Sequence, residues 1–172
     1  MLQSLFLILT TLLLNGCATQ EVHVGAPLDV RARWALLPIA NHAETAQAGE
    51  RVQAMLMTLL RNRGVTEIQP SPEIADNEGL PELNDQRRLE AARTWVKQQG
   101  YTYGVTGSVE EWRYKSGTDG EPAAAVSLQV IDIATGQVVW SATGARTGWG
   151  RESVSGVAQK LLKDLLHSMP LK

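Results

Sequence analysis

The chain begins with an apolar stretch, Leu5–Leu14, that contains no charged residue and precedes the only cysteine, Cys17. Even counted from Leu2 to Leu14, the stretch is shorter than the ~20 residues that a helix needs to cross a bilayer. It matches instead the apolar core of a secretory signal. We therefore expect residues 1–16 to be a removable signal peptide, and the rest of the chain is long enough for one domain with a hydrophobic core.

The cysteine itself stands in a recognisable motif. Leu14, Asn15, Gly16 and Cys17 resemble the bacterial lipobox, in which a peptidase cuts before a cysteine whose thiol carries diacylglycerol. The motif predicts that the mature protein begins at a lipidated Cys17, and three acyl chains would anchor it stably. Ala18 stands where the inner-membrane retention signal usually has Asp, so we expect the protein on the periplasmic face of the outer membrane.

After the cysteine, the sequence predicts a lipidated flexible tether at 17–30, which contains Gly25 and Pro27. A single α/β periplasmic domain should follow at 31–172. Hydrophobic periodicity and turn residues predict strands at 34–40, 65–69, 103–115, 123–133 and 138–143, and helices at about 44–63, 84–100 and 153–168. This order predicts a mixed, largely antiparallel sheet with helices packed on its faces.

Charge is distributed unevenly, although the formal net charge of −2 gives no general attraction to nucleic acid. Acidic residues gather between Glu67 and Asp85, where no Lys or Arg occurs, and at the tip of a predicted hairpin. The candidates are Glu73, Asp76, Glu78, Glu82, Asp85, Asp119 and Glu121. They form either an ordinary solvated face or, if several copies face one axis, a strongly negative field.

Residue patterns typical of catalytic or metal sites are missing from the sequence. His23, His42 and His167 are scattered along the chain, and there is no second cysteine. Glu110 and Glu111 are adjacent in a predicted strand, so they should point to opposite faces and not act as an acid and base pair. We therefore expect no enzyme activity, no cofactor and no metal.

Trp149 lies between Gly148 and Gly150 in a predicted loop, which leaves little neighbouring side-chain volume to bury its ring. Tryptophan favours the interface between membrane and water. In a lipid-anchored protein, Trp149 is therefore a candidate membrane contact. The alternative is that the ring packs under the last helix.

Longer segments resemble known families. Residues 34–39, followed by a long helix, and residues 128–140 resemble the lipoproteins related to curli secretion, which include stimulators of cell-wall synthases. More closely, residues 112–117, 120–122, 144–149 and 156–160 are similar to the PelC family. The resemblance extends over essentially the whole mature chain.

The PelC resemblance implies an outer-membrane lipoprotein, not an enzyme, that is needed for export of the Pel exopolysaccharide by biofilm-forming bacteria. It implies a dodecameric ring beneath PelB, the β-barrel porin of the Pel system, with a partly deacetylated, cationic amino-sugar polymer in transit. In such a ring, the acidic candidates would concentrate the polymer by electrostatic focusing without binding it tightly. Their role as guides is our own hypothesis.

The alternative function is a monomeric periplasmic activator of a peptidoglycan synthase. Such activators usually have a long disordered tether. The tether predicted here has about a dozen residues and spans at most ~40 Å when fully extended. This length favours an export component that stays close to the membrane.

Overall fold

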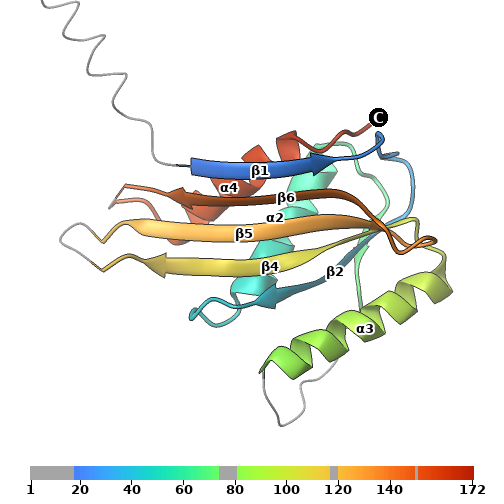
Figure 1. Cartoon of the computed structure of the whole chain (residues 1–172), viewed down its shortest axis with the longest axis horizontal. Helices are drawn as coiled ribbons and strands as arrows, with labels where there is room; N and C mark the ends of the chain where they lie inside the picture. The colour runs from blue at the N-terminus through green and yellow to red at the C-terminus, as the bar shows by residue number, and fades with distance from the viewer. Residues whose placement is uncertain (1–17, 74–80, 117–119, 150) are drawn as a thin grey trace, which may run out of the picture.

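The computed structural model describes residues 18–73, 81–116, 120–149 and 151–172, with Pro81 and Glu82 defined only as part of a helix. These residues form a six-stranded sheet in the order β1-β6-β5-β4-β2-β3 (Figure 1). The strands are β1 (Ala18–Val24), β2 (Trp34–Asn41), β3 (Ile68–Pro70), β4 (Tyr103–Tyr114), β5 (Pro122–Asp132) and β6 (Val138–Thr147). β2 runs parallel to β3 and β4, and the other neighbours are antiparallel, which confirms the predicted mixed sheet.

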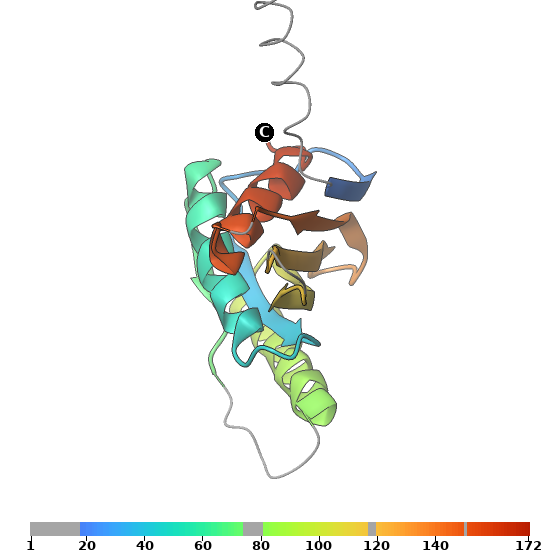
Figure 2. The same cartoon turned by 90° about the vertical axis from the view of Figure 1, so that its left-hand side faces the viewer.

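Two helices, α2 (Ala48–Asn62) and α4 (Val154–His167), cover one face of the sheet (Figure 2). Val126 and Leu128 of β5 belong to the buried core that they share with Leu161 of α4. The apolar stripe that predicts α4 is buried along the whole helix. The oxygen of the Ser153 side chain accepts a 3.0 Å hydrogen bond from the Gly156 amide and caps the helix, as the sequence predicts.

The third helix, α3 (Pro81–Gln99), lies on the opposite face, over β2 at one side of the sheet (Figures 1 and 2). Ala92 and Val96 of α3 pack with Ala35 and Leu37 of β2, whereas Trp34 belongs to the core under α2 and α4. β2 is therefore covered on both faces, as its continuous apolar run predicts. Among the described residues, no helix covers the same face over β5, β6 and β1.

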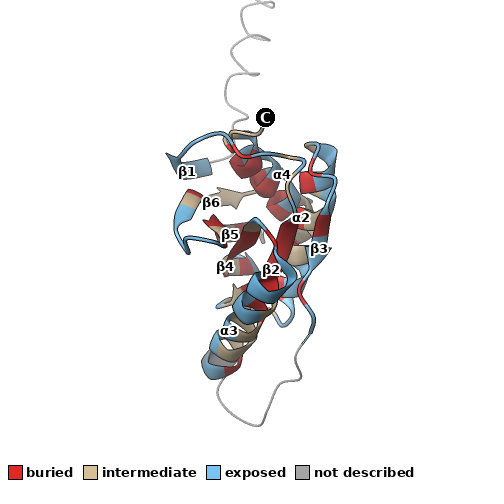
Figure 3. Ribbon diagram, turned by 90° about the vertical axis from the view of Figure 1, so that its right-hand side faces the viewer, coloured by how far each residue is buried: buried red, intermediate tan, exposed pale blue. Residues whose placement is uncertain are grey.

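The first strand differs from the prediction of a flexible tether. Residues 18–24 form β1, an edge strand antiparallel to β6, with Ala18 opposite Arg146 and Val24 opposite Trp140. All seven of its residues are exposed, and the strand is coloured accordingly in Figure 3. The strand is held by its backbone hydrogen bonds to β6 and buries no side chain. Its sequence therefore lacks the alternation of apolar residues that would predict a strand.

α2 begins at Ala48, later than the predicted start near Glu44. The side-chain nitrogen of Asn41 donates a 2.9 Å hydrogen bond to the Thr45 carbonyl, and the Thr45 hydroxyl donates one of 2.5 Å to the Trp112 carbonyl. These contacts hold the segment before α2 in a loop. The partner on β4 is distant in sequence, so local helix propensity does not reveal it.

Candidate functional site

At one end of the sheet, the start of the described chain lies near two exposed aromatic residues. Ala18 pairs with the C-terminal part of β6, and Trp149 follows that strand. Tyr114, at the end of β4, pairs with Pro122, whose carbonyl accepts a 2.8 Å hydrogen bond from the Gly148 amide. We call this region, defined by Ala18, Tyr114 and Trp149, the aromatic end of the sheet.

Both rings at the aromatic end are more than half exposed, Trp149 at 56% and Tyr114 at 54%. Trp149 is thus not packed under α4. Such rings combine an apolar body with a polar group, which suits the interface between membrane and water. Cys17 directly precedes Ala18 in the sequence. Cys17 lies outside the described residues, but a lipid attached to it would hold the aromatic end close to a membrane.

The loop that carries Trp149 is braced by Glu152. The Glu152 carboxylate accepts a 3.1 Å hydrogen bond from the Trp149 amide and forms an ion pair with Lys160 of α4. The Glu152 amide in turn donates a 2.8 Å hydrogen bond to the Trp149 carbonyl. The hydrogen bond from Lys160, and then the one from the Trp149 amide, lower the pKa of Glu152. The carboxylate therefore keeps its charge, and the loop its brace, at neutral pH.

On the side opposite α2 and α4, strands β4, β5, β6 and β1 present small polar side chains. The alternation that sends Val126 and Leu128 into the core sends Ser127 and Gln129 to this side. Strand register aligns these side chains in three rows, each with one residue from β1, β6, β5 and β4 in that order. The first row is Thr19, Ala145, Ala125 and Glu111; the second is Glu21, Thr143, Ser127 and Ser108; the third is His23, Ser141, Gln129 and Thr106. We call these rows the open face; none of the positions carries Lys, Arg or a large apolar side chain. Thr106 is its one buried member, and its hydroxyl donates a 2.7 Å hydrogen bond to the Pro38 carbonyl.

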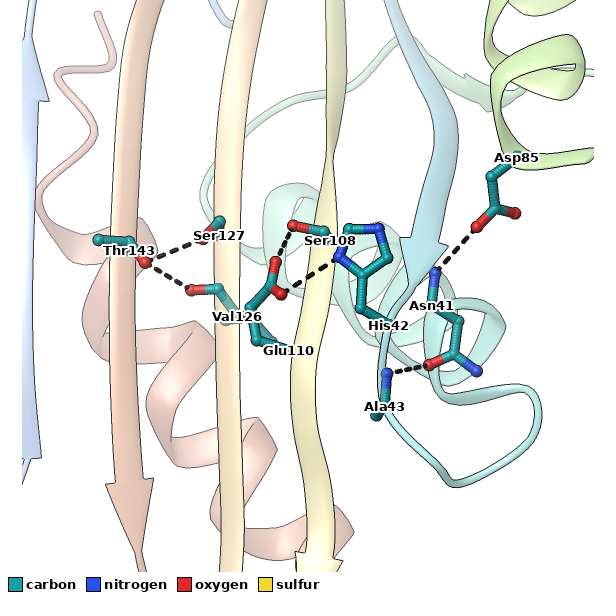
Figure 4. Close-up of polar contacts among 9 residues, drawn as sticks. All are labelled: Asn41, His42, Ala43, Asp85, Ser108, Glu110, Val126, Ser127 and Thr143. Atoms are coloured by element: carbon teal, nitrogen blue, oxygen red, sulfur yellow. Dashed lines mark hydrogen bonds and ion pairs between the residues drawn. The ribbon is translucent and has the colours of Figure 1, made fainter. Parts of the chain in front are cut away.

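Glu110 stands at the border of the open face. A β-bulge between Val109 and Glu111 interrupts the alternation of β4, so the sequence-based argument for Glu110 and Glu111 on opposite faces does not hold here. The Glu110 carboxylate accepts a 2.5 Å hydrogen bond from the Ser108 hydroxyl and lies 3.2 Å from the His42 ring nitrogen Nδ1 (Figure 4). The hydrogen bond from Ser108, with a smaller effect of His42, lowers the pKa of Glu110.

The acidic candidates lie in different surroundings. Glu121 is exposed at the aromatic end, where its carbonyl accepts a 2.7 Å hydrogen bond from the Lys115 amide. Glu73 is exposed after β3. Asp76, Glu78 and Asp119 lie outside the described residues. Glu82 is described only as a residue of α3.

The carboxylate of Asp85, unlike those of the other described candidates, makes contacts within the fold through both of its oxygens. It accepts a 3.3 Å hydrogen bond from the Asn41 amide (Figure 4), and its second oxygen lies 3.7 Å from an Arg88 nitrogen. Its side chain is only 23% exposed. These contacts join the start of α3 to the end of β2, which is a structural role for Asp85.

The described residues contain no group of three or more His, Cys, Asp or Glu side chains placed to hold a metal ion. His23, His42 and His167 lie on β1, in the loop after β2 and in α4, respectively. Within the same described ranges, no helix is long and apolar enough to cross a membrane.

Sequence reasoning missed Tyr114 and the open face. Tyr114 ends a strand whose buried alternation is readable, but its exposure depends on the end of the sheet being uncovered. The open face depends on the register between strands that are far apart in the chain. Alternation identifies which residues share a face, but not whether a helix covers it.

The described residues form a small α/β domain whose fold is also found in a solved bacterial lipoprotein. No protein-family model and no curated protein matches the sequence. Lipoprotein GNA1162 from Neisseria meningitidis shares the fold with a TM-score of 0.56 at 13% identity, over 79% of this chain and 96% of that one.

Two other solved structures are much more similar. The PelC dodecamer from Paraburkholderia phytofirmans has a TM-score of 0.77 and 34% identity, over 91% of this chain and 99% of that one. A point variant of that PelC has a TM-score of 0.78 at the same identity, over 91% and 100% of the two chains. The chain belongs to the PelC family, which confirms the resemblance found in the sequence.

Proposed function

We propose that this protein is an outer-membrane lipoprotein, anchored through Cys17, that forms a periplasmic ring and assists export of a cationic exopolysaccharide of the Pel type. In this proposal the ring lies on the inner leaflet beneath a PelB-type β-barrel porin. The observation that carries the proposal is the position of the exposed rings of Tyr114 and Trp149 at the end of the sheet where the chain leaves Cys17. This end is built to rest on a membrane.

Membrane contact is supported by the way β1 begins. The sequence predicts a tether of about a dozen residues, but the seven residues Ala18–Val24 of that segment form β1. While β1 stays paired with β6, little free chain separates a lipid on Cys17 from the domain. The domain is then held against the bilayer, where Trp149 can insert its ring at the level of the headgroups.

The ring is supported by the family. The similar PelC from Paraburkholderia phytofirmans is a dodecamer, and the match extends over nearly all of both chains. A closed ring needs two different surfaces of each copy to meet head to tail. Several copies in one ring would also multiply weak membrane contacts such as that of Trp149 into stable seating.

Exposed acidic residues would guide the cationic polymer. Glu121 is exposed at the aromatic end, next to the proposed membrane surface, and Glu73 is exposed near the start of the acidic segment. Repeated around a ring, such charges add to a negative field that attracts a polycation without holding it at one site. Asp119, beside Glu121 in the chain, is part of the same hypothesis.

A monomeric activator of a peptidoglycan synthase is the alternative function. An activator anchored in the outer membrane must reach across the periplasm. The pairing of β1 with β6 shortens the free chain even further than the sequence suggests. This favours the export component.

Charge reversal tests the guiding role. Asp119→Lys combined with Glu121→Lys should lower the amount of secreted polymer, and added salt should reduce the difference from the native protein by screening the field. Glu90→Lys, at an exposed position on α3, is the matched control. Normal secretion by the hairpin variant, with the protein present at its usual level, would remove the guiding role from these acids.

A further inference from the structure

The open face contains a trough that the proposed ring and membrane contacts leave unexplained. It has a volume of about 630 Å³, within the range of ~300–1,000 Å³ that is usual for ligand sites. Its floor is formed by β5 and β6, including Ser127, Gln129 and Thr143. Glu21 of β1 borders one side and Leu89 of α3 lies on the other. The lining of the trough therefore comes from four strands and from α3.

The floor offers hydroxyl groups for hydrogen bonding. Ser127 and Thr143 share a 2.9 Å hydrogen bond between their hydroxyl oxygens (Figure 4), and Thr143 also donates to the Val126 carbonyl at 3.3 Å. A hydroxyl has one donor and two acceptor positions, so these contacts leave acceptor capacity on both side chains. Gln129 and Ser141 in the next row add further groups of both kinds.

The carboxylates on and beside this floor outnumber the cations. Glu111 forms a 2.8 Å ion pair with Arg113, and Glu110 lies 3.2 Å from His42, whereas no ion pair is found for Glu21 among the described residues. Glu21, Thr143, Ser127 and Ser108 stand opposite one another across four strands, and the Glu110 carboxylate accepts a hydrogen bond from the Ser108 hydroxyl at the end of this row. At about 4.8 Å per strand, Glu21 and Ser108 are roughly 14 Å apart. The row thus carries hydroxyls along its length and a carboxylate near each end, with no Lys or Arg among the open-face positions. An anionic ligand is disfavoured, and a polar, cationic one is favoured.

We propose that the open face binds an extended oligosaccharide that carries free amino groups. Sugar hydroxyls would bond to Ser127, Thr143 and Gln129, and ammonium groups would approach Glu21 and Glu110. This inference rests on the proposed function, because it gives the exported polymer a defined contact surface on each copy. Since the carboxylates are exposed, each contact is weak, which permits the chain to move on.

The proposal is tested by measuring binding to the protein after it has been purified from membranes in mild detergent. The probe is a glucosamine hexamer, compared with its fully N-acetylated counterpart, which lacks the charge, and with spermine, which lacks the hydroxyls. Saturation-transfer NMR and calorimetry should detect the glucosamine hexamer and give clearly weaker signals for the other two. Equal binding of spermine would overturn the proposal, since it would leave only unspecific attraction between charges.

Two conservative variants localise the site. Glu21→Gln and Thr143→Val should each weaken binding of the hexamer about threefold, the size expected for one exposed polar contact. Their matched controls are Glu67→Gln, exposed just before β3 at the other edge of the sheet, and Thr58→Val, exposed on α2 on the opposite face; both should bind like the native protein. Losses of equal size in the controls would contradict the assignment of the site.

A neighbouring copy of the chain is the competing occupant of the open face. Ser127→Arg would place a long charged side chain in the trough, and it should abolish binding of the hexamer while the protein keeps its native oligomeric mass. Dissociation of the oligomer by this variant would identify the face as a subunit interface and overturn the proposal. Failure of hexamer binding, in cells whose polymer secretion still requires the gene, would overturn this inference alone and leave the proposed function standing.

Discussion

Replacing Trp149 with alanine should weaken the contact of the domain with a neutral bilayer. The side chain is 56% exposed, so about 140 Å² of a surface that reaches about 250 Å² is free to contact lipid. At about 25 cal/mol/Å², complete burial of this area would contribute about 3.5 kcal/mol. A ring lying at the level of the headgroups buries about half of it, so each copy should lose about 1.7 kcal/mol, or roughly 15-fold in partitioning.

The assay is flotation of residues 18–172 with phosphatidylcholine vesicles, because the acyl chains of the lipidated protein would mask the loss. Val24→Ala is the control, since Val24 is 51% exposed at the far end of β1 from Ala18 and should have little effect. The effect of Trp149→Ala should persist in high salt, because the ring contributes apolar area and not charge. Equal binding by Trp149→Ala and the native domain, or an equal loss in Val24→Ala, would refute the reasoning.

Three further predictions concern the lipid, the brace and the ring. Cys17→Ser should abolish labelling by an alkyne fatty acid and remove the protein from the outer membrane; equal labelling would exclude Cys17 as the modified residue. Because its pKa is lowered, Glu152 should remain charged, and its brace intact, above the ordinary carboxyl pKa of about 4.3. The brace is lost as the pH falls through the depressed pKa, so vesicle binding should be constant at every pH above the ordinary carboxyl pKa and fall only at more acidic pH, while a Glu152→Gln variant should bind weakly throughout. Native mass spectrometry of the detergent-purified protein should show a closed oligomer of about twelve copies, and monomers alone at tens of micromolar would count against the ring.

The sequence allowed most of the sheet and helices to be predicted, because their buried residues repeat at the period of the element. The apolar stripe of α4, from Val154 to Leu166, is buried in the structure, and so are Val126, Leu128 and Val130, the residues of β5 that the alternation assigns to one side. β1 has no such signal, since all seven side chains are exposed and only its backbone is paired. A strand held by backbone bonds alone resembles a tether in sequence.

The candidate site could be predicted only in part for a similar reason. The glycine neighbours of Trp149 made its exposure one of two possibilities, and the structure decides between them. The row from Glu21 to Ser108 depends on three strand registers, and the anchoring of Asp85 depends on the meeting of α3 with Asn41. These are properties of tertiary packing, so the charge of Asp85 in the sequence could not reveal that its carboxylate is already engaged.

The most direct test of the proposed function is the amount of polysaccharide secreted by cells in which the gene for this protein has been deleted. The export function predicts that secretion of the cationic polymer stops and returns with the native gene, but not with a gene encoding Cys17→Ser, while peptidoglycan synthesis is unchanged. Undiminished secretion together with impaired peptidoglycan synthesis would contradict the export function and favour the synthase activator.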